Sequence, residues 1–170
     1  MLPFIGLPSM AQDSLSPRLQ IGIGILPAVI AANKRLSSED GQTLQVYLVY
    51  RNNHHLAEQL KPALAKIDRV RKRRLQVESI SLTELLQTEP AASSAIFIAE
   101  PMGNNLDDLI EFVQQKQVLL FSPFEGDVER GVTAGFRVTD KVLPMVNMAS
   151  LKLSNIYLKA FFLRVAVKHE

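Results

Sequence analysis

The hydrophobic positions of this chain repeat first with the period of a helix and then with that of a strand. Leu19, Ile23, Leu26 and Ile30 share one helical face, which predicts a helix over 17–36, opened by a serine and a proline and kinked near its internal proline. The next run, "TLQVYLVY" at 43–50, is β-rich and apolar, as expected of a buried strand. The order helix, then strand, is therefore set within the first fifty residues.

The pattern then alternates between the two periods. A helix is predicted over 56–70, a strand over 75–82 and a helical turn over 83–86. Two apolar runs, "SAIFIAEP" and "QVLLFSPF", are typical of strands that are buried on both faces. Between them a helix runs to about residue 115, and either Asn104 or Asn105 can cap its start.

The last forty residues predict a hairpin and a helix. Val132, Ala134, Phe136 and Val138 alternate with polar neighbours, a turn follows, and 142–147 returns as a strand. Pro144 lacks an amide donor, so this strand is predicted at a sheet edge or at a bulge. A helix is expected from about residue 148, and four of its side chains are expected to contact the core: Leu158, Phe161, Phe162 and Val165.

Together these elements predict an α/β fold. Alternating strands and helices indicate a three-layer arrangement around a mostly parallel sheet, with a C-terminal antiparallel hairpin and terminal helices. At 170 residues the chain has the length of one domain, which we assign to 17–170. Residues 1–16 are interpreted as the remnant of a signal peptide and a tail.

Composition and the N-terminal residues bear on the cellular compartment in which the protein works. Cysteine is absent, which excludes disulfides and thiolate catalysis. A short apolar run is followed by Ser9 and Ala11, small residues at the spacing that signal peptidase accepts, so a cut after Ala11 and a periplasmic location are expected. The alternative interpretation is an apolar N-terminal tail.

Candidate catalytic chemistry is sparse. The adjacent His54 and His55 point to different faces of any regular element, and His169 lies at the end of the sequence, so no metal site is expected. No Gly-x-Ser-x-Gly elbow and no glycine-rich phosphate loop occurs. The sequence therefore favours a non-enzymatic protein without a cofactor.

The basic run "RVRKRR" at 69–74 is the strongest charge feature. It is interpreted as the solvated end of a helix, where cations favour the helix dipole, with a partner or membrane-surface contact as the alternative. The formal net charge of the chain is only +2, and no aromatic residues interleave the run, so nucleic acid is not an expected partner.

Polar loops mark a candidate ligand site. Ligands of open parallel sheets bind beyond the carboxyl ends of the strands, and three loops are predicted there. Their candidate ligand-binding residues are Arg51, Asn52, Asn53, Asn104, Asn105, Ser122 and Glu125. Ordinary turn and cap chemistry uses the same residue types and is the alternative.

The C-terminal segment resembles a known family. In 131–166, Gly131, Phe136 and the Val146-Asn147 pair are followed by a final helical pattern. Together with Ala149, Leu153, Ser154, Leu158 and Ala166, these residues are similar to the C-terminal pattern of the YfiR-like family of bacterial periplasmic proteins. The order of the earlier elements extends the resemblance loosely over 17–168.

The resemblance implies a function. It implies a non-catalytic periplasmic α/β domain that can form a homodimer and that regulates an inner-membrane signalling protein, such as a diguanylate cyclase of cyclic di-GMP signalling, through protein contact. The alternative expectation is a small-ligand-binding accessory protein of a transport system.

Overall fold

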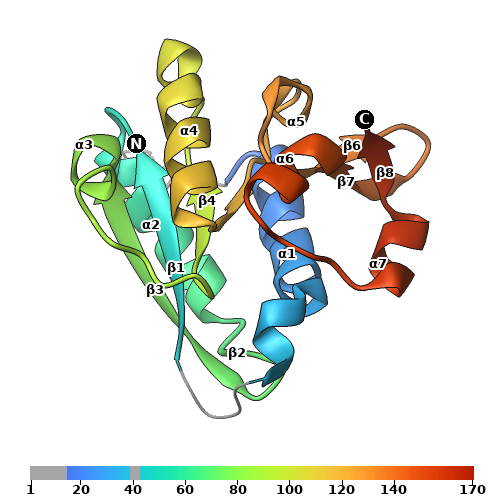
Figure 1. Ribbon diagram of the computed structural model, residues 1–170. Helices are drawn as coiled ribbons and strands as arrows, with labels where there is room; N and C mark the ends of the chain where they lie inside the picture. The colour runs from blue at the N-terminus through green and yellow to red at the C-terminus, as the bar shows by residue number, and fades with distance from the viewer. Residues whose placement is uncertain (1–14, 39–42) are drawn as a thin grey trace, which may run out of the picture.

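The computed structural model describes residues 15–38 and 43–170, and in these residues eight strands form one sheet (Figure 1). From one edge to the other the strands are β2 (Arg69–Val70), β3 (Arg73–Ser81), β1 (Leu44–Tyr50), β4 (Ala95–Ile98), β5 (Leu119–Phe121), β6 (Ala134–Val138), β7 (Val142–Asn147) and β8 (Val167–His169). Strands β3, β1, β4, β5 and β6 are parallel, and β7 is antiparallel to β6. The predicted mostly parallel sheet with a C-terminal hairpin is confirmed.

Helices cover both faces of this sheet. They are α1 (Pro17–Ala32), η1 (Lys34–Ser38), α2 (His54–Ala65), α3 (Leu82–Leu85), η2 (Gly103–Asn105), α4 (Leu106–Lys116), α5 (Asp127–Arg130), α6 (Met148–Leu153) and α7 (Ala160–Val165). α1 begins where Ser16 Oγ accepts a hydrogen bond from the Leu19 amide, and it continues through Pro27 as one helix. It ends at Ala32 rather than at 36, and η1 follows.

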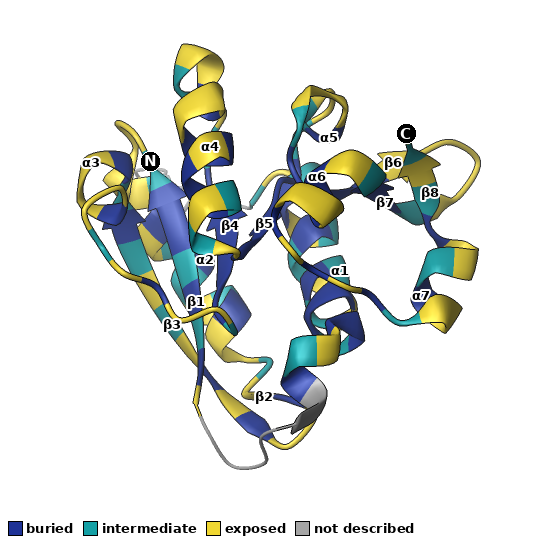
Figure 2. Ribbon diagram, viewed as in Figure 1, coloured by how far each residue is buried: buried dark blue, intermediate teal, exposed yellow. Residues whose placement is uncertain are grey.

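Two apolar clusters, one on each face of the sheet, make the structure three-layered. α1 and α2 pack on one face together with Leu48 of β1, and α3 and α4 pack on the other together with Val49. Neighbouring residues of a strand point to opposite faces, which is why β4 and β5 are apolar throughout. Both strands are buried along their whole length, whereas β1 contains both buried and half-buried residues (Figure 2).

The basic run forms a hairpin, so the prediction that it closes a helix is wrong. α2 ends at Ala65, and β2 pairs with β3 in an antiparallel hairpin in which Val70 lies opposite Arg73. Asp68 and Arg71, at the two bends, have positive φ angles of 57° and 56°. Val70 is buried in the cluster beneath α1, and Arg71 Nε donates to Ala31 O at 3.0 Å. The apolar spacing that continues beyond α2 thus belongs to the sheet.

The C-terminal segment differs from the predicted single helix. It folds as α6, a connecting loop, α7 and β8, and Asn155 in the loop has a φ of 53°. Leu158 and Phe162 are buried as predicted, but Phe161 and Val165 are 56% and 58% exposed. The prediction that the last two contact the core is wrong, because the short α7 turns them outward.

The prediction that the strand containing Pro144 lies at a sheet edge is wrong for the strand as a whole. β7 lies between β6 and β8, and β8 is the edge strand. Pro144 pairs with Phe136 of β6, whereas β8 pairs with β7 only from Met145 onward. Pro144 therefore lies beyond the residues of β7 that pair with β8. Its missing N–H thus removes no hydrogen bond between these two strands.

In the part of the chain that the structure describes, no helix has both the length and the hydropathy to cross a bilayer. The expected signal-peptide remnant falls almost entirely in 1–14, outside the described residues.

Candidate functional site

The strand order creates a reversal point at β1. The chain leaves β1 for β3 on one side and then returns to β4 on the other, so the carboxyl ends of β1 and β4 lie next to each other. Loops diverge at such a point, which is why open α/β sheets commonly bind ligands there. We call the end of the sheet where β1, β3, β4, β5 and β6 finish the carboxyl edge.

Glu100 occupies the centre of the reversal point. Its Oε1 accepts hydrogen bonds from three successive backbone amides, those of Arg51, of Asn52 at 2.5 Å and of Asn53 at 3.1 Å. Burial raises the pKa of the Glu100 carboxyl, but the amide hydrogen bonds and the charge of Arg51 outweigh burial, so the pKa is lower than usual. The carboxylate thus fills the amide pocket that the loop after β1 presents.

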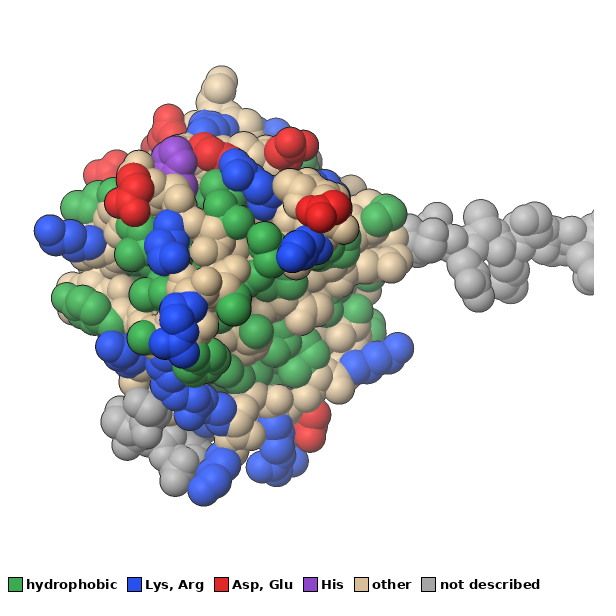
Figure 3. Space-filling view, turned by 90° about the vertical axis from the view of Figure 1, so that its right-hand side faces the viewer, with side chains coloured by type: hydrophobic (Ala, Val, Ile, Leu, Met, Phe, Trp, Pro, Cys, Tyr) green, Lys and Arg blue, Asp and Glu red, His purple; other side chains and the backbone are tan. Residues whose placement is uncertain are grey.

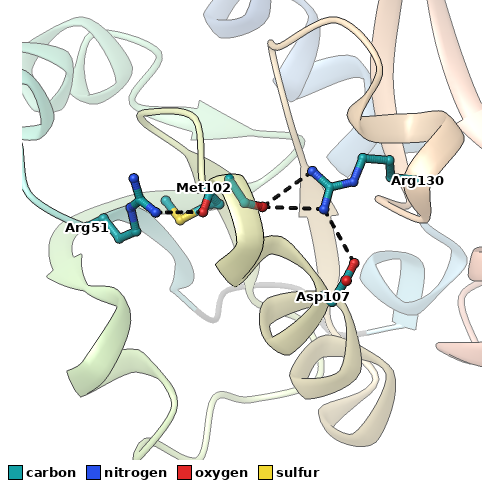
Figure 4. A network of polar contacts seen from close by, with 5 residues as sticks. Arg51, Met102, Asp107 and Arg130 are labelled. Atoms are coloured by element: carbon teal, nitrogen blue, oxygen red, sulfur yellow. Dashed lines mark hydrogen bonds and ion pairs between the residues drawn. The ribbon is translucent and has the colours of Figure 1, made fainter.

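Two arginines hold η2 from opposite sides (Figure 4). Arg51 Nη1 donates to Met102 O at 3.0 Å and to Asn105 Oδ1 at 3.1 Å. Arg130, at the end of α5, donates to Gly103 O at 3.3–3.4 Å and lies 3.5 Å from Asp107 Oδ1. These contacts connect the loops after β1, β4 and β5 into one structure.

Ser122 makes its side-chain hydrogen bonds within the segment that follows β5. It is buried, its Oγ donates to Asp127 Oδ2 at 2.6 Å, and the Phe124 amide donates to the same Oγ at 3.1 Å. Burial raises the pKa of the Asp127 carboxyl, an effect that the Ser122 hydrogen bond and Arg130 reduce without cancelling. Ser122 therefore shapes the loop after β5 rather than facing a ligand.

A cavity of about 290 Å³ opens at the carboxyl edge, two strands from the reversal point. Its walls come from the start of α1, the loop after β5, α5, the end of β6 and the middle of β7. The lining residues are Arg18, Phe124, Glu125, Gly126, Val128, Glu129, Phe136, Arg137, Val138 and Met145. We call this space the edge cavity.

The edge cavity combines an apolar floor with charges of both signs. Phe136 and Met145 are buried, whereas Arg137, Glu125 and Glu129 are charged lining residues. Arg18 is held at the wall, since its Nε donates to Pro123 O at 2.7 Å and its guanidinium lies 4.8 Å from the centre of the Phe136 ring. The volume lies near the lower end of the range for ligand pockets, roughly 300–1,000 Å³.

Apart from Ser122, which bonds within the loop after β5, the sequence-predicted residues fall into three groups. Arg51, Asn52, Asn53 and Asn105 meet at the reversal point; Asn53 Oδ1 also caps α2 by accepting from the Leu56 amide at 3.0 Å. Asn105 precedes α4 but makes no side-chain cap, because its Oδ1 accepts from Arg51. Asn104 is exposed in η2, and of the seven residues only Glu125 lines the edge cavity.

Sequence reasoning missed most of the edge cavity. Arg18, Phe136 and Arg137 come from elements that were expected to supply only helix or sheet, and Glu129 lies in α5, which was not predicted. The available signal was parallel pairing: if β6 is parallel to β5, Arg137 at its end must reach the carboxyl edge.

In the described ranges, no three His, Cys, Asp or Glu side chains come together in a way that could hold a metal ion. The edge cavity itself is a small concave space with Arg18 held at its wall, acidic groups in its lining and an aromatic floor.

Comparison with known proteins identifies the fold. No family model matches the chain, and no curated protein matches it. A conserved domain protein from Vibrio cholerae O1 biovar El Tor str. N16961 matches at a TM-score of 0.62 and 14% identity, over 92% of this chain and 61% of that one. An ABC domain in complex with L-Trp from Streptococcus pneumonia matches at a TM-score of 0.53 and 12% identity, over 89% of this chain and 60% of that one.

The chain thus spans about three fifths of the length of these two proteins. At such low identity the likeness concerns the fold alone, and the chain is similar to them as an α/β domain with a mostly parallel sheet.

Proposed function

We propose that this chain is a non-enzymatic protein that binds a small polar ligand in the edge cavity. The observation that carries the proposal is the mixed lining of that cavity. Arg18 is fixed over the Phe136 ring, and the lining also contains the charged residues Glu129 and Arg137. A ligand that carries polar or charged groups on a small apolar body would satisfy both parts of this lining.

The reversal point is the less suitable location for a ligand. Its amides are already bonded to Glu100, and Arg51 is bonded to Met102 and Asn105. A ligand there would have to break these bonds before making its own. This comparison favours the edge cavity.

The proposed setting is the periplasm, which the small residues Ser9 and Ala11 support. There the protein would serve as a ligand-binding accessory of a transport system. One of the similar folds reported above is an ABC domain in complex with L-Trp, which supports a ligand-binding role.

A second candidate function is control of an inner-membrane signalling protein, such as a diguanylate cyclase, by direct contact. The resemblance of 131–166 to the YfiR-like family supports this role.

The test is a thermal-shift screen of the purified chain with amino acids, nucleotides and sugars, followed by calorimetry of any ligand found. We expect one compound class to raise the melting temperature. The double variant Arg137→Ala/Glu129→Ala should weaken its binding by roughly tenfold or more.

The matched control is Arg74→Ala/Glu89→Ala, which removes the same charges outside the cavity. Equal loss of affinity in both double variants would contradict the assignment of the ligand to the edge cavity. If no compound binds and the chain is recovered with a signalling protein instead, the second candidate function replaces the first.

A further inference from the structure

Four large hydrophobic side chains of the C-terminal segment face solvent. Leu153 is 64% exposed, Tyr157 60%, Phe161 56% and Val165 58%. Among the described residues the three other exposed large hydrophobic side chains, Leu86, Val138 and Val142, are only 37–48% exposed. We call these four residues the apolar surface.

The segment that carries the apolar surface is firmly attached to the core. Ile156, Leu158 and Phe162 alternate with the exposed residues and are buried in the cluster beneath α1. The Lys34 amide donates to Tyr157 O and the Lys159 amide to Ala32 O, both at 2.9 Å. The exposure of the four side chains is therefore a fixed feature of the folded chain.

A groove of about 630 Å³ lies beside Tyr157. Met148, Leu151, Ile156 and Leu163 supply apolar walls, and the groove is long enough to reach from α6 to the end of the chain. Its charged lining residues are Lys34, Lys152 and Glu170. The region thus presents an apolar depression bordered mainly by cations.

The charge of this region is mainly positive, with Glu170 as the acidic residue in the groove lining. From Lys141 to His169 the sequence contains no Asp or Glu, whereas it contains Lys152, Lys159, Arg164 and Lys168. In the space-filling view of this side, hydrophobic and cationic side chains intermix over the middle and left, and acidic side chains lie mainly toward the top (Figure 3). An occupant of this surface should therefore be anionic.

The residue types of the apolar surface and its surroundings indicate what covers it: a second copy of the chain, another protein or a membrane. A second copy of the chain would bring two cationic surfaces together in an isologous contact, which like-charge repulsion disfavours. Protein–protein interfaces are depleted in lysine. Exposed aromatic and aliphatic side chains among lysines and arginines are instead typical of proteins that lie on anionic membranes.

We infer that the apolar surface docks the protein on an anionic lipid bilayer. Tyr157, Phe161 and Leu153 enter the boundary between headgroups and acyl chains. Lys152 and Lys168 contact lipid phosphates, because long cationic side chains reach the interface while their stems stay apolar. The attachment is reversible and peripheral, and it uses a surface that is separate from the edge cavity.

The test is co-sedimentation of the full chain with vesicles of phosphatidylcholine that contain about 30% phosphatidylglycerol, compared with pure phosphatidylcholine vesicles. We expect binding to the anionic vesicles and a decline as salt rises from about 0.05 M to 0.5 M, since screening weakens the attraction. The variants Lys152→Glu/Lys168→Glu and Tyr157→Ser/Phe161→Ser should each lower the bound fraction at least about tenfold.

Matched controls separate the surface from overall charge and hydropathy. Lys61→Glu/Lys66→Glu makes the same charge change on and just after α2, and Leu86→Ser removes an exposed apolar side chain elsewhere. Both should bind like the wild type, with circular dichroism confirming the fold of every variant. Equal binding to the two vesicle types, loss of binding in the controls, or occupation of the surface by a second copy or a partner protein instead of lipid would overturn the inference.

Discussion

At the scale of single residues, Glu100 makes the most consequential contacts of the carboxyl edge. Its carboxylate accepts from three amides, and its folded-state pKa is lower than the usual 4.5. The stabilisation is therefore fully present above that usual value and is lost as the pH falls through the lowered one. We expect Glu100→Gln to reduce the free energy of unfolding by about 1–2 kcal/mol at neutral pH.

The difference between wild type and Glu100→Gln should shrink as the pH falls from neutral through the lowered pKa of Glu100, because the wild-type carboxyl then becomes uncharged as well. Urea unfolding across this pH range measures it. Glu89→Gln is the control: Glu89 pairs with Lys116 at 2.6 Å but is 83% exposed, so its loss should cost at most about 0.5 kcal/mol. A pH-independent difference for Glu100→Gln would contradict this account.

Gly135 gives a second prediction at this scale, because β6 passes very close to the loop after β5. A Cβ on Gly135 would lie 2.7 Å from Ser122 O and 2.8 Å from Val128 Cγ2. Gly135→Ala should destabilise the fold by about 1–3 kcal/mol, as expected for an overpacked site.

Gly24→Ala is the matched control for Gly135→Ala. Gly24 lies within α1, and a Cβ there would meet nothing within 4 Å. The change should stabilise the protein by up to about 1 kcal/mol, since alanine loses less backbone entropy in a helix. Thermal unfolding of both variants tests the pair, and similar effects of the same sign would refute the steric explanation.

At the scale of elements, Arg35 of η1 joins two helix ends that are far apart in sequence. Its Nη1 donates to Gln117 O at 2.5 Å, and its Nη2 donates to Asn155 O at 2.8 Å. Gln117 after α4 and Asn155 after α6 both have left-handed backbone conformations, so each helix end presents carbonyls that a forked donor can reach.

We expect Arg35→Ala to lower the free energy of unfolding by about 1.5–3 kcal/mol, the range for hydrogen bonds to a charged group. Arg35→Lys should recover only part of that loss, because an ammonium is a compact donor without the planar fork of the guanidinium. Denaturant unfolding of the two variants measures the effect. If Arg35→Lys kept the full free energy of unfolding, the positive charge alone, and not the planar fork of donors, would account for the stabilisation.

The elements themselves could be predicted where the hydrophobic residues follow a single pattern, either that of a buried strand or that of one helix face. β1, β4 and β5 are short apolar runs, and α4 keeps four apolar residues on one face, so sequence reasoning placed them within a few residues. It failed at 69–74 because helical spacing continued by coincidence into β2. It failed after 148 because local spacing cannot reveal that Asn155 breaks the helix.

The candidate site was predictable only in part. Loops that follow buried strands could be assigned to one edge of the sheet, which brought Arg51, Asn52 and Asn53 to the correct place. Whether their polar groups bond within the protein or stay available to a ligand depends on Glu100 and Asn105, which are about fifty residues away in the sequence. The position of Arg18 required knowing where α1 crosses the carboxyl edge.

At the scale of the whole molecule, one core joins the beginning and the end of the chain. Leu26 of α1, Leu48 of β1, and Leu158, Phe162 and Ala166 of the C-terminal segment belong to the same buried cluster. A shared core couples these parts, so unfolding should be a single cooperative transition.

Tyrosine fluorescence can test this, since the chain has three tyrosines and no tryptophan. In Tyr47→Phe/Tyr50→Phe, Tyr157 alone reports on the C-terminal segment while far-ultraviolet circular dichroism reports on the whole chain. The two midpoints should coincide in denaturant. An earlier transition at Tyr157 would show that the C-terminal segment unfolds separately.

Glu100 has one further consequence for the molecule as a whole. A group attached to the same chain acts at an effective concentration of the order of millimolar or higher when its linkage allows the contact. Glu100 is thus a tethered competitor that no free carboxylate or phosphate at lower concentration displaces from the amides of Asn52 and Asn53. Glu100 thus fills, from within the chain, the position at which such sheets often bind ligands, and the edge cavity two strands away stays open.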